Sequence, residues 1–191
     1  MRIAISMEMT RRLRDTWHAA LNHEWYDFLN GHVIVPVCCH GALPDLSGID
    51  LVILAGGNDM ADIRTWRDNH YPLRDRFEQA LIDACVRQTV PVMGICRGFH
   101  FLNWSQGGTH CLMPEPYDGI SVDLPSFQVT CHHTIQIDRL APGFDILEQD
   151  AKGVIELARD RQKRLLGVGW HPEREINRHT RDLVLDLVDD L

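Results

Sequence analysis

The sequence predicts an α/β fold built around a mostly parallel sheet. Short apolar runs alternate along the chain with longer stretches of helical periodicity, the order expected of strands joined by helices. The run Ile49–Ala55 is almost continuously apolar, which is typical of a strand buried on both faces. Sharp glycine turns follow two of the runs, at Gly56-Gly57 and within Gly94–Gly98. No linker or internal repeat divides the chain, so we expect residues 1–191 to form one domain.

The N-terminal quarter predicts two strands separated by a helix. Arg2–Ser6 is a short apolar run and the expected first strand. Thr16–Leu29 carries apolar residues close to helical spacing, and Asn30-Gly31 is a suitable helix end. His32–Val37 is the next expected strand, and its proline favours an edge position.

The middle of the chain predicts the centre of the sheet. The buried run Ile49–Ala55 is followed by an expected helix at Pro72–Gln88, with apolar residues on one face and charges on the other. Val90–Ile95 is the next strand, and Cys96 opens a further helix that Gly107-Gly108 closes.

The C-terminal part predicts a loop, a strand pair and a helix. Prolines break Cys111–Gln128 repeatedly, so we expect a loop there. Val154–Ala158 and Leu165–Trp170 are expected to pair through a charged turn. Glu175–Leu191 is amphipathic and is the expected final helix.

Composition narrows the class of protein. Hydrophobic residues make up 45% and charged residues 24% of the chain, an ordinary globular balance that excludes disorder. The formal charge is -8 and there is no basic stripe, so we expect neither a nucleic acid nor an anionic membrane as partner. The first residues do not resemble a secretory signal, and we expect a cytoplasmic protein with six free cysteines.

The most informative segment is Val90–Gly98, in which a buried strand enters a Gly-x-Cys-x-Gly turn and then a helix. This is the thiol counterpart of the nucleophile elbow, where a strained turn presents the nucleophile and small residues let strand and helix approach. The helix N-terminus favours a Cys96 thiolate, and the backbone N–H of Arg97 is aimed at a developing oxyanion. Cysteine is also a common buried residue, but the strand before it and the helix after it favour the nucleophile.

A cysteine nucleophile needs a base, and the base needs a group that orients it. His171 and Glu173 directly follow the expected strand Leu165–Trp170, two residues apart, so their side chains can point the same way. A plain surface turn is the simpler interpretation of this segment, but the pair follows a strand that leads to the same sheet edge as Cys96, which favours the catalytic interpretation. The glycine pair Gly56-Gly57 follows another strand end, where a backbone N–H can approach a ligand, although a simple turn is equally compatible.

Two cysteine–histidine runs, Cys38-Cys39-His40 and Cys131-His132-His133, raise the question of a metal. Adjacent strand residues point to opposite faces, so three in a row cannot all bind one ion. No C-x-x-C or H-x-x-x-H spacing is present, and we therefore expect no metal and no organic cofactor. His133 is instead expected to line a substrate pocket.

Together these segments resemble the class I glutamine amidotransferases. Within them, the chain is most similar to the γ-glutamyl hydrolase branch, which includes γ-glutamyl-γ-aminobutyrate hydrolase and γ-glutamyl-CDP-amidate hydrolase. The resemblance covers nearly the whole chain, and the segments that carry it are Ala55–Asp59, Pro91–Gly98, Leu102-Asn103 with Gly107–Thr109, Val129–His133 with Asp138–Phe144, and Leu166–Glu173.

The resemblance implies a flavodoxin-like three-layer sandwich with a central, mainly parallel sheet. It implies that Cys96 is the nucleophile, His171 the base and Glu173 the group that orients it. The backbone N–H groups of Gly57 and Arg97 would form the oxyanion hole.

The chain departs from the family pattern at the expected substrate site. Gly56, His100, Cys131 and His133 are the residues expected there. His100 stands where the family usually has glutamine, and Cys131 where it usually has serine. The segment 111–128 is shorter than in the family, which would alter the wall of the site.

The expected function is hydrolysis of a γ-glutamyl amide, glutamine or a γ-glutamyl conjugate, through a glutamyl thioester. One alternative is a glutaminase subunit that delivers ammonia to a separate synthetase partner. A second is a binding protein of the same fold without catalysis, which the departures at His100 and Cys131 would favour and the set of Cys96, His171 and Glu173 opposes.

Overall fold

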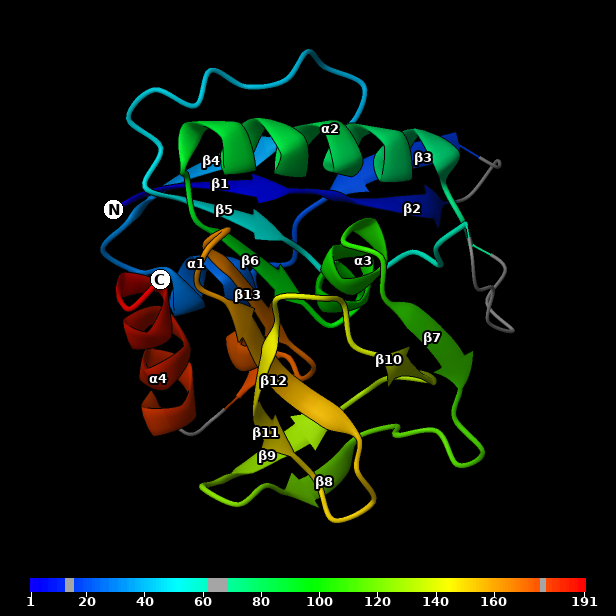
Figure 1. The fold of residues 1–191 in the computed structure, drawn as a ribbon. Helices are drawn as coiled ribbons and strands as arrows, with labels where there is room; N and C mark the ends of the chain where they lie inside the picture. Colours follow the sequence, from blue (N-terminus) through cyan, green and yellow to red (C-terminus); the bar gives the residue numbers. More distant parts are fainter. Residues whose placement is uncertain (13–15, 62–68, 176–177) are drawn as a thin grey trace.

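The computed structural model describes residues 1–12, 16–61, 69–175 and 178–191. Within these residues, seven strands form a central sheet in the order β11-β12-β13-β6-β5-β1-β4 (Figure 1). They are β1 Arg2–Ser6, β4 Val33–Val37, β5 Leu51–Leu54, β6 Val92–Ile95, β11 Asp145–Gln149, β12 Ile155–Asp160 and β13 Leu165–Val168. The pairs β2-β3, β7-β10 and β8-β9 form small two-stranded sheets. They are β2 Glu8–Arg12, β3 Thr16–Ala20, β7 Thr109–Leu112, β8 Ile120–Asp123, β9 Gln128–Cys131 and β10 Ile135–Arg139.

The sheet is mixed but mostly parallel, as the sequence predicts. The strands β4, β1, β5, β6 and β13 run parallel to one another, whereas β12 and β11 continue the sheet in antiparallel pairs. The strand β4 lies at the edge, where Pro36 costs no hydrogen bond within the sheet interior. The antiparallel pairing of β12 with β13 confirms the predicted strand pair.

Helices cover both faces of the sheet. The described helices are α1 Glu24–Phe28, α2 Pro72–Gln88, α3 Arg97–Ser105, the short 3-10 helix η1 Pro172–Arg174 and α4 Arg178–Asp189. The helices α2 and α3 share one hydrophobic core with Val52 and Leu54, while α1 and α4 share the other with Leu51 and Ile53 (Figure 1). Because side chains alternate along β5, the two cores lie on opposite faces. This confirms the predicted three-layer sandwich.

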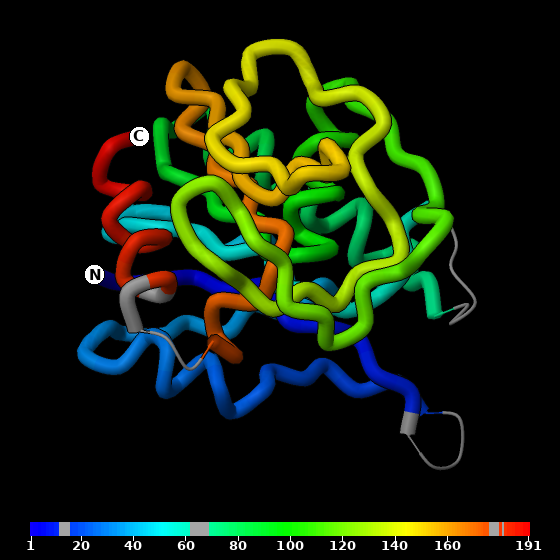
Figure 2. Tube along the Cα trace, turned by 90° about the horizontal axis from the view of Figure 1, so that it is seen from below, coloured from blue at the N-terminus to red at the C-terminus, as the bar shows by residue number. Residues whose placement is uncertain are grey.

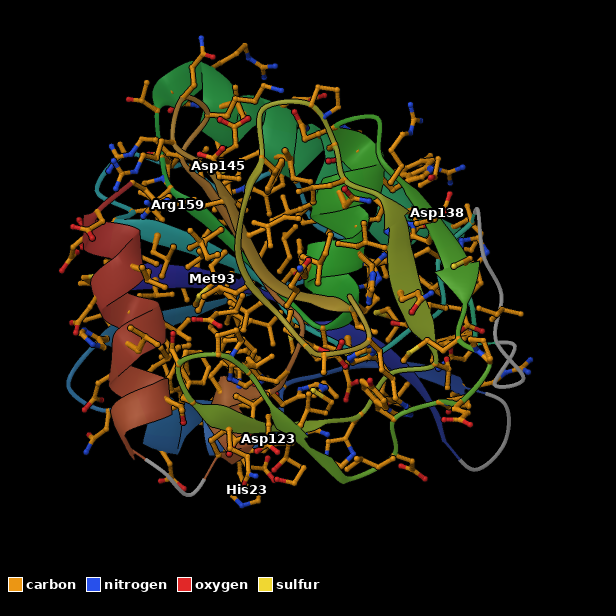
Figure 3. The ribbon with its side chains drawn as sticks, turned by 60° about the horizontal axis from the view of Figure 1, so that its bottom comes forward. His23, Met93, Asp123, Asp138, Asp145 and Arg159 are labelled. Carbon is orange, nitrogen blue, oxygen red and sulfur yellow. The ribbon has the colours of Figure 1, made fainter. Side chains whose placement is uncertain are left out.

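The inner strands of the central sheet are buried between the helix layers, and exposed residues lie at the rim. Met93 of β6 lies inside the packed side chains, whereas His23 and Asp138 lie at the rim of the molecule (Figure 3). The two chain ends lie on the same side (Figure 2), where Met1 and the α4 residue Asp189 line one surface hollow. Each described helix is too short or too polar to cross a lipid bilayer.

The predicted helix at Thr16–Leu29 is wrong over most of its length. Its first part is β3, which pairs with β2 as an antiparallel hairpin, and only Glu24–Phe28 is helical. Trp17 packs on Tyr71, with ring centroids 4.7 Å apart. Threonine and tryptophan favour strands, and this cross-strand and tertiary packing outweighs a helical spacing of apolar residues.

The predicted loop at Cys111–Gln128 is also partly wrong, because β8 lies within it and pairs with β9. The strands β10 and β11 are not expected from the sequence. The strand β10 pairs with β7, which lies more than twenty residues earlier in the chain. The strand β11 pairs with β12, and the register of that pair is irregular. The final helix as described is α4 Arg178–Asp189, and the predicted start at Glu175 is wrong, because Glu175 follows η1 with extended backbone; residues 176–177 lie outside the described residues.

The elbow between β6 and α3 depends on backbone contacts that exclude side chains. A Cβ atom at Gly98 would lie 2.0 Å from the carbonyl oxygen of Leu54, and one at Gly94 would lie 2.4 Å from that of Gly98. The strand β5, the strand β6 and the first turn of α3 are therefore in direct backbone contact. This contact places the helix N-terminus against the end of β5.

We predict that Gly98→Ala lowers the free energy of unfolding by about 1–3 kcal/mol or more, the usual cost of overpacking. The obstructing atom is backbone, which cannot rotate away. Gly41→Ala is the matched control, because its added Cβ would meet only the Cys38 carbonyl oxygen at an ordinary 3.4 Å. Urea unfolding measures both variants. A Gly98→Ala protein as stable as the control would contradict the close approach.

Candidate active site

The site lies where three neighbouring strands of the sheet end. The strands β5, β6 and β13 are parallel, so their carboxyl ends meet at one edge. Gly56-Gly57 follow β5, Cys96 follows β6, and His171 follows β13. Ligands bind at this edge in open parallel sheets. The fold thus brings together the segments that the sequence singled out separately.

Cys96 occupies a strained turn. Its backbone has φ of 52° and ψ of -110°, although it is not glycine, and such a conformation costs about 1–3 kcal/mol. The turn is held by a 2.7 Å hydrogen bond in which the Cys96 N–H donates to the carbonyl oxygen of Val168. The residue that follows, Arg97, begins α3. Cys96 therefore stands at the tip of the predicted elbow.

His171 and Glu173 form a buried pair beside the elbow. Nδ1 of His171 and Oε1 of Glu173 are 2.6 Å apart, and both side chains are almost fully buried. Pro172 begins η1 between them, which fixes the geometry of the pair. The carboxylate accepts a hydrogen bond from the Nδ1–H group of His171, which leaves Nε2 for Cys96.

Gly56 lies at the point where these groups converge. A Cβ atom there would lie 2.9 Å from Cε1 and 3.7 Å from Nε2 of His171, and 3.7 Å from Cβ of Cys96. Any side chain at this position would displace the imidazole. Glycine is therefore required at position 56, because the His171 ring and Cys96 lie so close to its backbone. Gly56 is one of the residues that the sequence analysis places in the site.

The electrostatics favour a thiolate at Cys96. Burial alone would raise the pKa of Cys96, but the charge of His171, its hydrogen bond to the thiol and the charge of His133 outweigh burial and lower it. Burial alone would lower the pKa of His171, but the Cys96 and Glu173 charges raise it. Both directions describe a thiolate–imidazolium pair. Such a pair is the reactive state of a cysteine nucleophile.

The loop after β5 is fixed by a buried arginine. Arg74 of α2 donates to the carbonyl oxygens of Ala55 and Gly56, at 2.6 and 2.9 Å. In a trans peptide the N–H points opposite to the carbonyl of the same unit, so the Gly57 N–H points away from Arg74. Gly57 itself is exposed and has φ of 112°. Arg74 therefore fixes the orientation of the peptide unit that carries the Gly57 N–H.

Arg74 belongs to a buried cluster of charges. Nε of Arg74 lies 2.9 Å from Oε1 of Glu78, and Arg97 contacts both Glu78 and Asp75. Burial would raise the pKa of Glu78, but the two guanidinium charges outweigh it and lower the pKa. No motif in the sequence marks this cluster. It ties α2 both to the loop after β5 and to the first residue of α3.

Two pockets meet at Cys96. Gly57, Cys96 and His132 line both of them. The first pocket, about 50 Å³, extends along α3 and is also lined by Asn58, Asp59, Met60, Arg97, His100, His133, Thr134 and Ile135. The second, about 170 Å³, extends under the β2-β3 hairpin and is also lined by Glu8, Ala20, Leu21, Asn22, Trp25, Ala55, Gly56, His171, Glu173 and Arg174. Cys96 therefore faces two separate spaces.

His100 lies in the wall of the first pocket, on the turn of α3 that follows the elbow. Its ring is buried, and neither ring nitrogen has a hydrogen-bond partner among the described residues. Burial, with the charges of His110 and His133, lowers the pKa of His100 well below its ordinary value. The ring is therefore a neutral imidazole with one free donor and one free acceptor.

His133 forms part of the same wall, and Cys131 lies behind it. His133 lines the first pocket, and its Nε2 lies 3.0 Å from Oε1 of Glu156 in β12. Cys131 is fully buried beside this pair and is not among the described residues that line the two pockets. Burial, followed by the charge of Glu156, raises the pKa of the Cys131 thiol.

Several residues of the site are not assigned to it by the sequence analysis. His132 lines both pockets and packs edge-on against His171, with ring centroids 6.1 Å apart. Arg74 and Glu156 also lie beside the site, but no motif marks them, since each comes from an element distant in sequence. The exception is His132, whose position next to His133 in the chain is a signal that could have identified it.

The chain is similar in sequence to known proteins. The chain is 28% identical over 159 residues to the glutamine amidotransferase-like protein YvdE of Lactococcus lactis, covering 67% of each. It is 28% identical over 135 residues to the gamma-glutamyl-CDP-amidate hydrolase of Campylobacter jejuni, covering 66% of this chain and 64% of that protein. The chain thus spans about two thirds of the length of these relatives.

A solved structure shares the fold. A GMP synthase subunit protein from Thermoplasma acidophilum superposes with a TM-score of 0.76 at 18% identity, covering 99% of this chain and 93% of that one. The family model Peptidase C26 matches residues 33–117 and 115–173, which include the elbow at Cys96 and the pair His171–Glu173. The chain that builds this site is accordingly a member of the Peptidase C26 family.

Proposed function

We propose that the protein is a cysteine-dependent hydrolase of γ-glutamyl amides, with Cys96 as nucleophile, His171 as base and Glu173 as the group that orients it. The observation that carries the proposal is the position of Cys96, at a strained elbow between two pockets and beside a buried histidine–glutamate pair. The similarity to a gamma-glutamyl-CDP-amidate hydrolase supports the choice of acyl group.

The reaction begins when the Cys96 thiolate attacks the γ-carbonyl carbon. The backbone N–H groups of Gly57 and Arg97 stabilise the oxyanion of the tetrahedral intermediate. His171 donates its Nε2 proton to the departing nitrogen, the C–N bond breaks, and a glutamyl thioester remains. His171 then takes a proton from water, the hydroxide attacks the thioester, and glutamate leaves with regeneration of the thiolate.

The two pockets divide the substrate between them. His171, which protonates the departing nitrogen, lines the second pocket and not the first. The leaving group therefore occupies the second pocket, and the glutamyl part occupies the first, beside His100 and His133. Of the two pockets that the described residues form at Cys96, the second is the larger, with a carboxylate at Glu8 and a guanidinium at Arg174 in its wall.

This division favours a γ-glutamyl conjugate over glutamine, because ammonia would leave the second pocket empty. The alternative of a glutaminase subunit requires a synthetase that receives ammonia. It would show glutamine hydrolysis that increases when the partner binds. A binding protein without catalysis would release no glutamate from any amide.

A panel of γ-glutamyl amides tests the proposed function. We expect purified protein to release glutamate from γ-glutamyl amides of bulky amines with a higher kcat/KM than from glutamine. The control is Cys96→Ala, which should release none from either. Hydrolysis of glutamine alone, or of no compound in the panel, would contradict the proposed substrate class.

The thiolate–imidazolium pair predicts a specific pH dependence. Because His171 lowers the pKa of Cys96, iodoacetamide should alkylate Cys96 at pH values well below the titration of an ordinary thiol. In His171→Ala the lowering charge is lost while burial remains, so the midpoint of the alkylation rate should move to higher pH. Peptide mass spectrometry measures the rate at Cys96. Buried Cys85, whose pKa burial raises to about 12, is the internal control. An unchanged midpoint would contradict the pair.

The free nitrogens of His100 predict a role in holding the glutamyl part. His100→Ala should lower kcat/KM roughly 5- to 150-fold, because a buried substrate group left without a partner costs about 1–3 kcal/mol. His110→Ala is the matched control, since its ring packs on His100 at 5.1 Å but does not line either pocket. Steady-state kinetics and melting temperature measure both. A His100→Ala variant with kcat/KM within about twofold of wild type would assign His100 to packing.

A further inference from the structure

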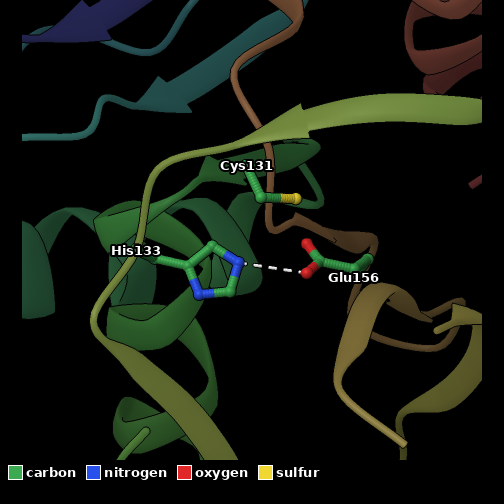
Figure 4. Close-up of side chains that lie close together, drawn as sticks. All are labelled: Cys131, His133 and Glu156. Carbon is green, nitrogen blue, oxygen red and sulfur yellow. Dashed lines mark hydrogen bonds and ion pairs between the residues drawn. The ribbon is translucent and has the colours of Figure 1, made fainter. Parts of the chain in front are cut away.

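A second cluster of potential ligands lies beside the first pocket. Cys131 ends β9, His133 follows it two residues later, and Glu156 comes from β12. One ligand atom from each, Sγ, a ring nitrogen and a carboxylate oxygen, lie within 4.8 Å of one another (Figure 4). All three side chains are buried. The residues differ from those to which the proposed hydrolysis assigns proton transfer.

Each side chain is held in an orientation that suits a ligand. The ring of His133 is fixed by a 3.0 Å hydrogen bond from Nδ1 to the carbonyl oxygen of Ile135, so that Nε2 faces Glu156. This arrangement, with one ring nitrogen on a backbone carbonyl, is usual for histidine ligands of metals. In Figure 4 the sulfur of Cys131 points toward the carboxylate of Glu156.

The carboxylate of Glu156 has unused capacity. Its Oε1 faces His133, whereas Oε2 is buried without a nitrogen or oxygen partner among the described residues. Oε2 lies against the backbone of Gly169, where a Cβ atom on that residue would come within 2.1 Å of it. The Cys131 thiol donates a hydrogen bond to Glu156 and directs its sulfur at this carboxylate. A cation that displaced the thiol proton would be held by the same sulfur and carboxylate.

We propose that Cys131, His133 and Glu156 bind a thiophilic divalent cation of the Zn²⁺ type. Sulfur, imidazole nitrogen and carboxylate oxygen are all ligands of zinc, at about 2.3, 2.0–2.1 and 2.0–2.2 Å. A sulfur ligand disfavours Mg²⁺ and Ca²⁺, which prefer oxygen. Three protein ligands leave a fourth tetrahedral position for a water molecule or another small ligand.

The ligand set compensates the charge of the ion. The Cys131 thiol loses its proton as the cation enters, so a thiolate and the Glu156 carboxylate offset the two positive charges, with His133 as a neutral ligand. A buried ion is costly chiefly when its charge has no compensation, and these ligands compensate it. Of the three proposed ligands, His133 lines the first pocket, which is therefore the route of access.

The sequence-based expectation of no metal rests on residues that are adjacent in the chain. Cys131 and His133 are two residues apart, which puts both on one side of an extended segment. The third ligand comes from β12 and could be recognised only in the fold. A cation here would occupy the wall of the glutamyl pocket and compete with the proposed substrate.

Metal binding by variants that lack the nucleophile tests the proposal without using activity. Cys96→Ala protein, freed of metal, should bind one equivalent of Zn²⁺ in equilibrium dialysis. With Co²⁺ it should show the thiolate-to-cobalt charge-transfer absorption of a sulfur ligand. Adding Cys131→Ser should abolish that absorption and weaken Zn²⁺ binding at least tenfold. Adding Glu156→Gln should weaken binding to a similar extent.

The matched control is Cys96→Ala with Cys85→Ser, a buried cysteine in α2 outside the cluster, which should bind as Cys96→Ala does. Melting temperatures without metal show which variants fold. If the Cys131→Ser protein fails to fold, Glu156→Gln decides the outcome. The proposal is overturned if Cys96→Ala binds no Zn²⁺, or if binding is unchanged in every folded variant of the cluster. Neither result bears on glutamate release, so the two proposals fail independently.

Discussion

The left-handed backbone of Cys96 is the constraint on which the site depends. A non-glycine residue with φ of 52° is held there by surrounding structure, at a cost of about 1–3 kcal/mol. The Cys96 N–H is anchored to Val168 in β13, and the next turn of α3 packs backbone to backbone on Leu54 of β5. The turn at Cys96 is therefore in direct backbone contact with β5 and β13 as well as continuous with β6. The same contacts that impose the strain set the thiol beside His171 and the glycine loop.

The buried charges under the site perform a related task. Arg74 and Arg97 balance Asp75 and Glu78, so the cluster is electrically compensated, and loss of one partner from such a group costs about 3–5 kcal/mol. Its residues touch the loop after β5 and the start of α3, the two segments whose N–H groups would hold the oxyanion. We regard the cluster as a rigid support that fixes these N–H groups before substrate binds.

The sequence predicted the parts of the fold whose signal is local. Pro72–Gln88 is helical over the predicted range, and the turn at Cys96 has the expected strand before it and helix after it. The hairpin at Thr16–Ala20 was mistaken for a helix because its stability comes from pairing with β2 and from Trp17 on Tyr71. Arg74 and Glu156 could not have been identified as parts of the site, since only packing of α2 and β12 brings them there.

The central claim is that Cys96 carries the glutamyl group during turnover. Rapid acid quenching of the protein with a γ-glutamyl anilide, followed by peptide mass spectrometry, tests it most directly. The account predicts one glutamyl group on the peptide that contains Cys96, removed by hydroxylamine as expected of a thioester. Turnover of the anilide with no glutamyl adduct on Cys96, or with the adduct on Cys131, would contradict it.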